Sequence, residues 1–432
     1  MIKSSDDERR IGIEVFYTNV RGIGGKLRKN PEDFIVEEIS SPLSKDDDGE
    51  YTIARIKVKN WETNRLIRQL SRRLGISRKR IGFAGTKDRR AVTTQLFSIK
   101  APIKDVRKLS LKDFEILEIY TSRQGLDLGD LLGNRFDIII KGIEVPDLDA
   151  NKSISDISEE LESLKGFPNF FGHQRFGAVR PITHIVGKKI IEGDFKGAVH
   201  IYIGNPVDIE GAEAFEARKT FEEGGSFADV LELFPKYFGF EKALLNHLIK
   251  KEGDYIGALN ALPKNLSMMF VHAYQSYIFN RILSQRIEKG LLTSEPLIGD
   301  IVIPMDKSGL PDHKKWIEVT DDNINKISKR VREKKAAISG LVPGSNVMFA
   351  KGRQGEIEEK VVEDEGVSPK DFIIPQMRRL SSKGIRREFV SPLSDFVYEI
   401  GDGGIRMQFT LQKGCYATAL LREFMKTDML SY

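Results

Sequence analysis

The 432-residue sequence contains one cysteine, Cys415. A lone thiol excludes the disulfide framework that stabilises many small secreted domains. The six histidines are scattered, without the spacing of a zinc ligand set. The sequence has no run of about 18 apolar residues, so we expect no membrane partner and no transmembrane helix. Residues 1–15 also lack the apolar segment of a signal peptide. Together these absences favour a protein of the reducing cytoplasm.

Motifs for nucleotide and metal cofactors are missing as well. The pattern G-x-x-x-x-G-K-[ST] of a phosphate-binding loop does not occur. The segment EIGDGGIR (399–406) has a glycine turn, but an alternating sequence follows it instead of the helix that a dinucleotide or methyl-donor site needs. We therefore expect a β-hairpin at this position, and neither a metal nor a small-molecule cofactor.

Positive charge is concentrated in one part of the chain. Residues 65–90 contain ten lysines and arginines and a single acid, Asp88, whereas the remainder is slightly acidic. Such a local excess is typical of a surface that binds a polyanion. A solvated basic face is the alternative interpretation.

The apolar pattern predicts an α+β fold in the first 145 residues. We expect strands within 34–39, 50–60, 91–100 and 133–145, and a helix within 60–75 that ends at Gly75. In the first strand Phe34, Val36 and Glu38 share one face. The order of the elements favours a largely antiparallel sheet over a doubly wound one, and the chain length predicts two domains.

The sequence pattern changes after about residue 150, where strand-like alternation gives way to other patterns. We expect a polar helix over 156–167, an aromatic and glycine-rich loop (PNFFGHQRFG) over 168–177, and mainly helices over 210–290. Residues 295–380 are expected to be rich in loops with short strands. The C-terminal residues predict a hairpin, a turn and a helix.

Asp88 lies in the segment IGFAGTKDRRAVTTQ among Lys87, Arg89 and Arg90. Neighbouring cations favour the ionised carboxylate, which can act as a nucleophile or a general base without a cofactor. Loop aspartates are more often turn formers. Cys415 is a second nucleophile candidate, although a lone cysteine is usually a small buried residue. The residues alone leave these alternatives open.

The segment FAGTKDRRAVTTQ resembles the signature A-G-x-K-D-x-x-A-x-T-x-Q of the TruD pseudouridine synthases. Four further segments resemble motifs of this family in the same order: KNPEDFIVEEI, GNRF, PNFFGHQRFG and GCYATALLREF. They extend from about residue 28 to residue 424. The resemblance implies a pseudouridine synthase catalytic domain with a mixed, mostly antiparallel sheet (1–166 and 390–432), and an inserted family-specific α/β (TRUD) domain (167–389).

The resemblance also implies a function. The family isomerises uridine to pseudouridine in tRNA, chiefly at position 13 in the D-arm, so the expected partner is tRNA, bound by a monomer. By resemblance Asp88 is the catalytic residue, acting on a flipped-out uridine as nucleophile or as base. The residues expected at the uridine are Arg28, Lys29, Phe34, Lys87, Asn134, Phe136 and Tyr416. Either Arg28 or Lys29 would pair with Asp88.

The RNA backbone is expected to contact a set of basic side chains: Arg65, Arg68, Arg72, Arg73, Arg78, Lys79, Arg80 and Arg175. Arg175 belongs to the 168–177 loop, for which we consider two roles, a hinge or cleft loop and a packed interdomain loop. Two other classes of protein remain as alternatives: a non-catalytic RNA-binding protein and a methyltransferase that uses Cys415.

Overall fold

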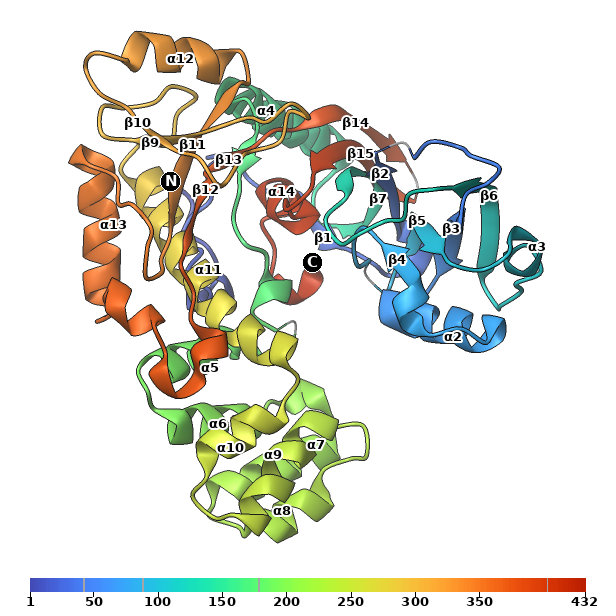
Figure 1. Ribbon diagram of the computed structural model, residues 1–432. Helices are drawn as coiled ribbons and strands as arrows, with labels where there is room; N and C mark the ends of the chain where they lie inside the picture. Colours follow the sequence, from blue (N-terminus) through green and yellow to red (C-terminus); the bar gives the residue numbers. More distant parts are fainter. Residues whose placement is uncertain (42, 88, 178, 402) are drawn as a thin grey trace. The chain divides into compact units, whose positions relative to one another are not determined.

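The computed structural model describes the whole chain except Pro42, Asp88, Ala178 and Asp402 (Figure 1). The chain forms two compact units. We call Thr18–Phe167 with Val390–Tyr432 the sheet unit, and Met1–Tyr17 with Pro168–Phe389 the helical unit. No helix in the described part of the chain is both long and apolar enough to cross a membrane.

Strands of the sheet unit form one sheet in the order β14-β15-β7-β2-β5-β3-β6, with β1 beside β7 and β4 beside β5. Their bounds are β1 Gly24–Lys26, β2 Phe34–Ser40, β3 Tyr51–Lys59, β4 Ile81–Phe83, β5 Val92–Ile99, β6 Phe114–Ser122, β7 Leu131–Ile143, β14 Ser394–Gly401 and β15 Gly404–Gln412. Only the β2–β5 pair is parallel among the described pairs of this sheet. The predicted mixed, mostly antiparallel sheet is confirmed.

Helix α2 (Thr63–Leu74) covers one face of this sheet. Its apolar residues Leu66, Ile67 and Leu70 are buried in a cluster with residues of β3 and β5. The 3.6-residue repeat puts these three on one side and the arginines of the helix on the solvent side. The helix ends at Gly75, whose φ of 64° is left-handed, as the sequence predicts.

The remaining elements of the sheet unit surround this arrangement. They are η1 Pro31–Asp33, η2 Arg78–Arg80, α3 Ile103–Val106, α4 Asp147–Leu164, α14 Ala417–Met425 and η7 Met429–Ser431. Strands β14 and β15 form a hairpin in which Gly401 pairs with Gly404, so the predicted hairpin is confirmed. The short strands β8 (Phe167–Pro168) and β13 (Val390–Ser391) pair where the chain leaves and re-enters the sheet unit.

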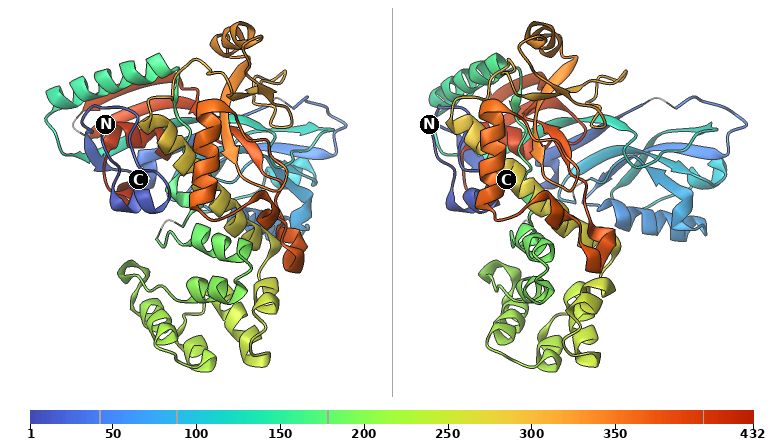
Figure 2. Two further views of the ribbon diagram at one scale, coloured as in Figure 1. Left: turned by 90° about the vertical axis from the view of Figure 1, so that its left-hand side faces the viewer. Right: turned by 60° about the vertical axis from the view of Figure 1, so that its left-hand side comes forward.

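The helical unit is built around the long helix α11 (Lys264–Glu288). In both figures α6–α10 gather toward one end of α11, and a sheet of order β10-β9-β11-β12 lies toward its other end (Figure 2). The other elements are α1 Asp6–Arg10, η3 His173–Arg175, α5 Thr183–Ile191, α6 Phe195–Ile203, η4 Asp208–Glu210, α7 Ala212–Glu222, α8 Phe227–Leu233, α9 Gly239–Lys250, α10 Tyr255–Ala261, β9 Ile301–Pro304, β10 Ile317–Glu318, β11 Ala336–Val342, η5 Pro369–Phe372, η6 Pro375–Leu380 and β12 Ile385–Glu388.

The region that we expected to be rich in loops with short strands contains the short strands β9, β10 and β11, but also two helices that were not expected. They are α12 (Ile324–Arg332) and α13 (Gly352–Asp364). Helix α12 buries only Ile327, and the buried aliphatic residues of α13 are Ile357, Val361 and Val362. The apolar residues of both helices recur at helical spacing, but they are few among charged residues, and the two helices were not predicted.

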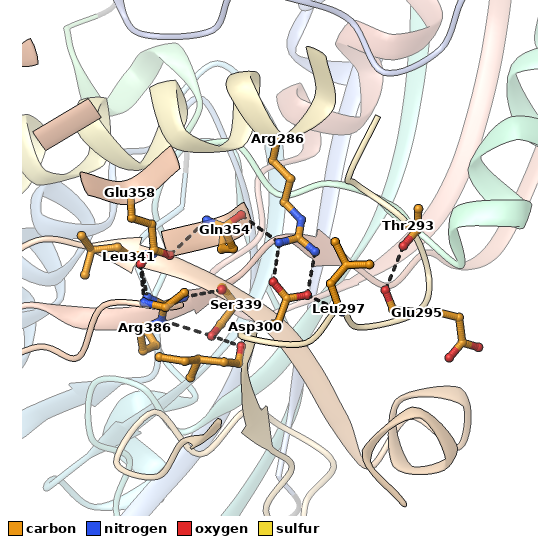
Figure 3. Close-up of polar contacts among 12 residues, drawn as sticks. Arg286, Thr293, Glu295, Leu297, Asp300, Ser339, Leu341, Gln354, Glu358 and Arg386 are labelled. Atoms are coloured by element: carbon orange, nitrogen blue, oxygen red, sulfur yellow. Dashed lines mark hydrogen bonds and ion pairs between the residues drawn. The ribbon is translucent and has the colours of Figure 1, made fainter. Parts of the chain in front are cut away.

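A buried network of charged side chains joins α11, α13 and the small sheet (Figure 3). Arg286 forms a bidentate pair with Asp300, at 2.6 and 2.8 Å, and Arg386 pairs with Glu358 at 2.8 Å. The side chain of Gln354 connects the pairs by accepting from Arg286 and donating to Glu358. Buried ions need such partners to offset their desolvation, so we interpret this network as structural.

The 168–177 loop is packed inside the helical unit. The Asn169 amide donates to the main-chain oxygen of Glu388 at 3.1 Å and accepts from Arg387 at 2.7 Å, and the Phe171 main-chain N–H donates to Asn280 at 2.9 Å. Arg175 donates to Ser276 at 3.3 Å. These contacts favour a packed loop over a hinge.

His184 should make the helical unit sensitive to acid. Its ring lies 5.3 Å from that of Phe176 and stacks on Tyr277 at 4.9 Å, and burial lowers its pKa to about 4. Between pH 6.5 and pH 4 the unfolded chain therefore binds a proton that the folded chain does not, so stability falls as pH falls through this window. At about 1.4 kcal/mol per unit over these 2.5 units, the loss is at most on the order of 3–4 kcal/mol.

The substitution His184→Phe keeps the stacked ring and removes the titrating group. Its thermal unfolding midpoint, measured from pH 7 to pH 4, should fall less steeply than that of the wild type. An identical pH dependence of the two proteins would show that His184 does not contribute to acid sensitivity.

Candidate active site

The segment around Asp88 lies at a gap in the sheet. Strand β5 pairs with β2 up to Thr94 and with β4 from Phe97 onward. Gln95 therefore lies in the gap between the segment of β5 that pairs with β2 and the segment that pairs with β4. The loop from β4 to β5 contains Asp88, which is outside the described residues. The residues on both sides of it are described, and they show how the loop is held.

Three contacts hold the part of the loop before Asp88. The Gln95 amide donates to the carbonyl of Gly85 at 3.0 Å, and the main-chain N–H of Lys87 donates to the Thr63 hydroxyl at 2.9 Å. The Lys87 ammonium pairs with Glu38 at 2.5 Å, and the two side chains are 5% and 0% exposed. The residue before Asp88 is thus fixed through both its main chain and its side chain.

Glu38 was not among the predicted site residues. It follows Phe34 and Val36 on the buried face of β2, and the Ser40 hydroxyl also donates to it, at 2.9 Å. The sequence contained a signal: a carboxylate on the inward face of a strand needs a buried partner. Since its ammonium lies against Glu38, Lys87 anchors the loop.

Asn134 lies on β7, opposite Glu38 of β2 and Leu411 of β15. Its Oδ1 is buried and has no hydrogen-bond partner among the described residues. The preceding Gly133 allows the close approach of β15, because a Cβ there would lie 2.3 Å from the carbonyl oxygen of Leu411. This explains why a glycine precedes the asparagine.

The two predicted phenylalanines form a wall beside Asn134. Phe34 and Phe136 are 1% and 7% exposed, and their ring centroids are 6.3 Å apart in an edge-to-face arrangement. Phe136 stacks on Phe409 at 5.2 Å, and the Arg28 guanidinium lies 4.0 Å from the Phe34 centroid. Since both rings are already packed, they shape the site more than they offer an open stacking surface.

Arg28 and Lys29 diverge in the structure. The guanidinium of Arg28 lies over Phe34, and its carbonyl accepts a hydrogen bond from Arg90 at 3.0 Å. Lys29 is exposed, with its ammonium beside Gly142 near the end of β7. Of the two, Arg28 is the one whose guanidinium lies beside a predicted uridine-site residue, Phe34.

Tyr416 approaches the same region from the C-terminal part of the chain. Strand β15 ends at Gln412, opposite Gly133, and the next residue, Lys413, donates its main-chain N–H to Leu132 at 3.0 Å. Tyr416 is half-buried and immediately precedes α14. The strand pairing therefore brings Tyr416 to the end of β7 that carries Asn134.

Buried polar contacts hold the far end of α14. The Glu423 carboxylate accepts from the Thr18 hydroxyl at 2.9 Å, and the Lys426 ammonium donates to that hydroxyl at 2.6 Å. Burial lowers the pKa of Lys426 to about 8. These contacts fix the helix that follows Tyr416.

Exposed basic side chains are concentrated on α2 and η2, which are close together in the sequence beside the catalytic loop. We call this set of side chains the basic strip. It comprises Arg65, Arg68, Arg72 and Arg73 on α2, and Arg78, Lys79 and Arg80 in η2. None of the seven forms an ion pair within the described part of the chain. Arg175 is not part of the strip, because it belongs to the helical unit.

Comparisons with known proteins give the same family along the chain. The model of the family tRNA pseudouridine synthase D (TruD) matches residues 10–424. Proteins named tRNA pseudouridine synthase D from Methanosarcina barkeri and Thermococcus onnurineus are 42% and 41% identical, covering 98% and 94% of this chain and 98% and 95% of their own.

A solved structure agrees with these sequences. The crystal structure of tRNA pseudouridine synthase D from Methanosarcina mazei matches with a TM-score of 0.87 and 40% identity, and the match covers 100% of both chains. The chain therefore belongs to the TruD family of tRNA pseudouridine synthases, the enzymes that isomerise uridine to pseudouridine in tRNA.

Proposed function

We propose that this enzyme modifies uridine 13 in the D-arm of tRNA and that Asp88 is its catalytic residue. The observation that carries the assignment is the anchoring of the loop at Lys87, next to the buried amide oxygen of Asn134, which has no hydrogen-bond partner in the described part of the chain. A fixed catalytic loop beside a free polar group is the arrangement that a nucleotide-modifying site requires.

The target nucleotide must leave the RNA stack before its glycosidic bond can be reached. Flipping costs a few kcal/mol, and stacking on an aromatic ring returns about 1–3 kcal/mol per base. We assign the stacking role to Tyr416, because it is half-buried whereas Phe34 and Phe136 are almost fully enclosed. Those two rings then form a wall of the uridine pocket.

Asn134 would hold the flipped base by a hydrogen bond. Its free Oδ1 is an acceptor, and the ring N–H of uracil is a donor. A buried acceptor without a partner carries an energetic penalty, which the bound uracil would relieve. This contact also selects a pyrimidine with a ring N–H over cytosine, which has none in its neutral form.

Asp88 acts at the glycosidic centre in this proposal. Attack on the sugar, attack on the base and removal of a sugar proton all break the C–N bond and allow the uracil to rejoin through carbon. The product is an isomer of the substrate, so the reaction balances without an oxidant, reductant or group donor. Arg28, over Phe34, is the cation that we assign as the partner of Asp88.

We further propose that the enzyme is a cytoplasmic monomer. We also propose that residues 1–166 with 390–432 form the catalytic domain, with 167–389 inserted as the TRUD domain, although residues 1–17 pack with the helical unit. The location of its tRNA substrate and the single cysteine support the cytoplasm. The predicted uridine-binding residues all belong to the sheet unit.

The direct test is to incubate the protein with unmodified tRNA, without any cofactor, and to map pseudouridine by carbodiimide treatment and primer extension. A single stop at position 13 is expected. Tight binding without product would indicate a non-catalytic RNA-binding protein. A dependence on an added methyl donor would indicate a methyltransferase that uses Cys415.

The basic strip should provide the salt-dependent part of tRNA binding. The double substitution Arg68→Ala/Arg72→Ala removes two exposed guanidinium groups from α2, so the slope of log K against log salt should decrease by about one per lost phosphate contact. Lys104→Ala, an exposed cation on α3, is the matched control and should keep the wild-type slope. An unchanged slope in the double variant would contradict the assignment.

A further inference from the structure

A pocket of about 340 Å³ opens beside β4 in the sheet unit, apart from the Asn134 site. Its lining includes Lys79 and Arg80 of η2, Tyr51, Lys100, Asp127 and Leu128. This volume is at the lower end of the range for small-ligand sites, about 300–1,000 Å³, and suits a single nucleotide.

The charge of the pocket favours a phosphate. Lys79, Arg80 and Lys100 line the pocket together with one acid, Asp127, and the Glu50 carboxylate pairs with Lys100. Lys79 and Arg80 are exposed and form no ion pair within the described part of the chain. The Lys100 ammonium lies 4.6 Å from the Tyr51 centroid and 3.1 Å from Glu50. Hydrogen bonds to Tyr51 and Glu50 raise the pKa of Lys100, which keeps the ammonium charged.

The wall opposite η2 is held rigidly. The main-chain N–H of Leu126 donates to the Ser98 hydroxyl at 2.9 Å. A Cβ on Gly82 would lie 2.2 Å from the Leu126 carbonyl oxygen, so the 125–128 loop packs on β4 only because residue 82 is a glycine. The shape of this wall is therefore fixed by hydrogen bonding and close packing.

The pocket is continuous with the basic strip and connected to the active site. The strip ends at Arg80, which lines the pocket. In the other direction, the Gly129 main-chain N–H donates to Ala84 at 2.8 Å, directly before Gly85, and the Gly129 carbonyl accepts from Lys413 at 2.9 Å. An RNA strand that follows the strip thus reaches a nucleotide-sized hollow beside the catalytic loop.

We propose that this pocket binds one unpaired nucleotide of the substrate tRNA, other than the target uridine, with its phosphate held by Lys79, Arg80 and Lys100. Asp127 provides an acceptor for a base amino group. The inference rests on tRNA being the substrate. It adds a second, non-reacting anchor that positions the RNA before the uridine flips.

Two substitutions test the pocket from different directions. Lys100→Ala removes a cation, and Leu128→Glu adds a negative charge at a side chain that is 74% exposed. Each should raise the tRNA dissociation constant roughly five- to tenfold at about 0.1 M salt, and Lys100→Ala should lower the salt slope by about one.

The control for Leu128→Glu is Leu148→Glu, the same change at a residue that is 80% exposed on α4 of the same unit. A set of tRNAs, each with one neutral methylphosphonate linkage, identifies the bound phosphate. One linkage outside the target nucleotide should weaken binding to the wild type, and should weaken binding to Lys100→Ala by a smaller factor, because only Lys79 and Arg80 then remain to contact that phosphate.

Wild-type affinity of both pocket variants, or an equal loss in Leu148→Glu, would overturn the proposal. The proposal would also be overturned if every neutral linkage weakened binding to Lys100→Ala by the same factor as binding to the wild type. These outcomes are distinct from failure of the proposed function, which would appear as an absence of pseudouridine at position 13 in the wild-type reaction.

Discussion

Asp88→Asn should leave the enzyme folded and able to bind tRNA but should lower the rate of pseudouridine formation by at least about a thousandfold. The amide has nearly the volume of the carboxylate, but it is a poor base and a poor nucleophile. Proton transfer by a positioned side chain alone contributes about 10²–10⁴ in rate, and loss of a nucleophile costs more. A single-turnover assay at saturating enzyme measures the chemical step separately from binding.

The control for this variant is Asp105→Asn, an exposed aspartate on α3 in the same unit, which should retain full activity. Pseudouridine formation by Asp88→Asn at the wild-type rate would show that another group performs the chemistry. Loss of tRNA binding together with activity would instead assign Asp88 a role in binding.

Glu38→Ala should strongly destabilise the sheet unit. It leaves the Lys87 ammonium, at 5% exposure, without its carboxylate. Removing one partner of a buried pair typically costs about 3–5 kcal/mol. The thermal unfolding midpoint should therefore fall on the order of 10 °C. Activity should fall as well, because the loop loses one of its three anchors.

Two further variants show whether the charge or the anchoring matters. Glu118→Ala breaks an exposed pair with Lys45 and should shift the midpoint only slightly. The double substitution Glu38→Leu/Lys87→Met replaces the buried pair by apolar side chains and should restore most of the lost stability. A restored rate in this double variant would make Lys87 purely an anchor. A wild-type midpoint in Glu38→Ala would contradict the buried pair itself.

The sequence predicted most of the sheet unit because its signals are local. The alternation predicted that Phe34, Val36 and Glu38 share one face of β2, and this face is the buried one in the structure. The spacing of Leu66, Ile67 and Leu70 predicted α2. Each pattern arises from one element packing against one core, so a short window contains it.

The pairing of Glu38 with Lys87 escaped prediction for a physical reason. The two residues are 49 positions apart, and their contact depends on the gap between β2 and β4 along β5. The apolar pattern around Glu38 and the one around Lys87 do not show that such a gap will form. The pocket beside β4 is similar, since it combines residues from η2, β5 and the 125–128 loop.

The pairing of β7 with β15 has a consequence for synthesis of the enzyme. Strand β7 ends at Ile143, and its partner ends at Gln412, so the two are translated far apart. At about 5–20 residues per second, roughly tens of seconds pass before β15 emerges. During this time Asn134 lacks its neighbouring strand, and Tyr416 does not yet exist. A nascent chain therefore lacks the complete sheet, and the site proposed around Asn134 and Tyr416 can form only after residue 416 has been synthesised.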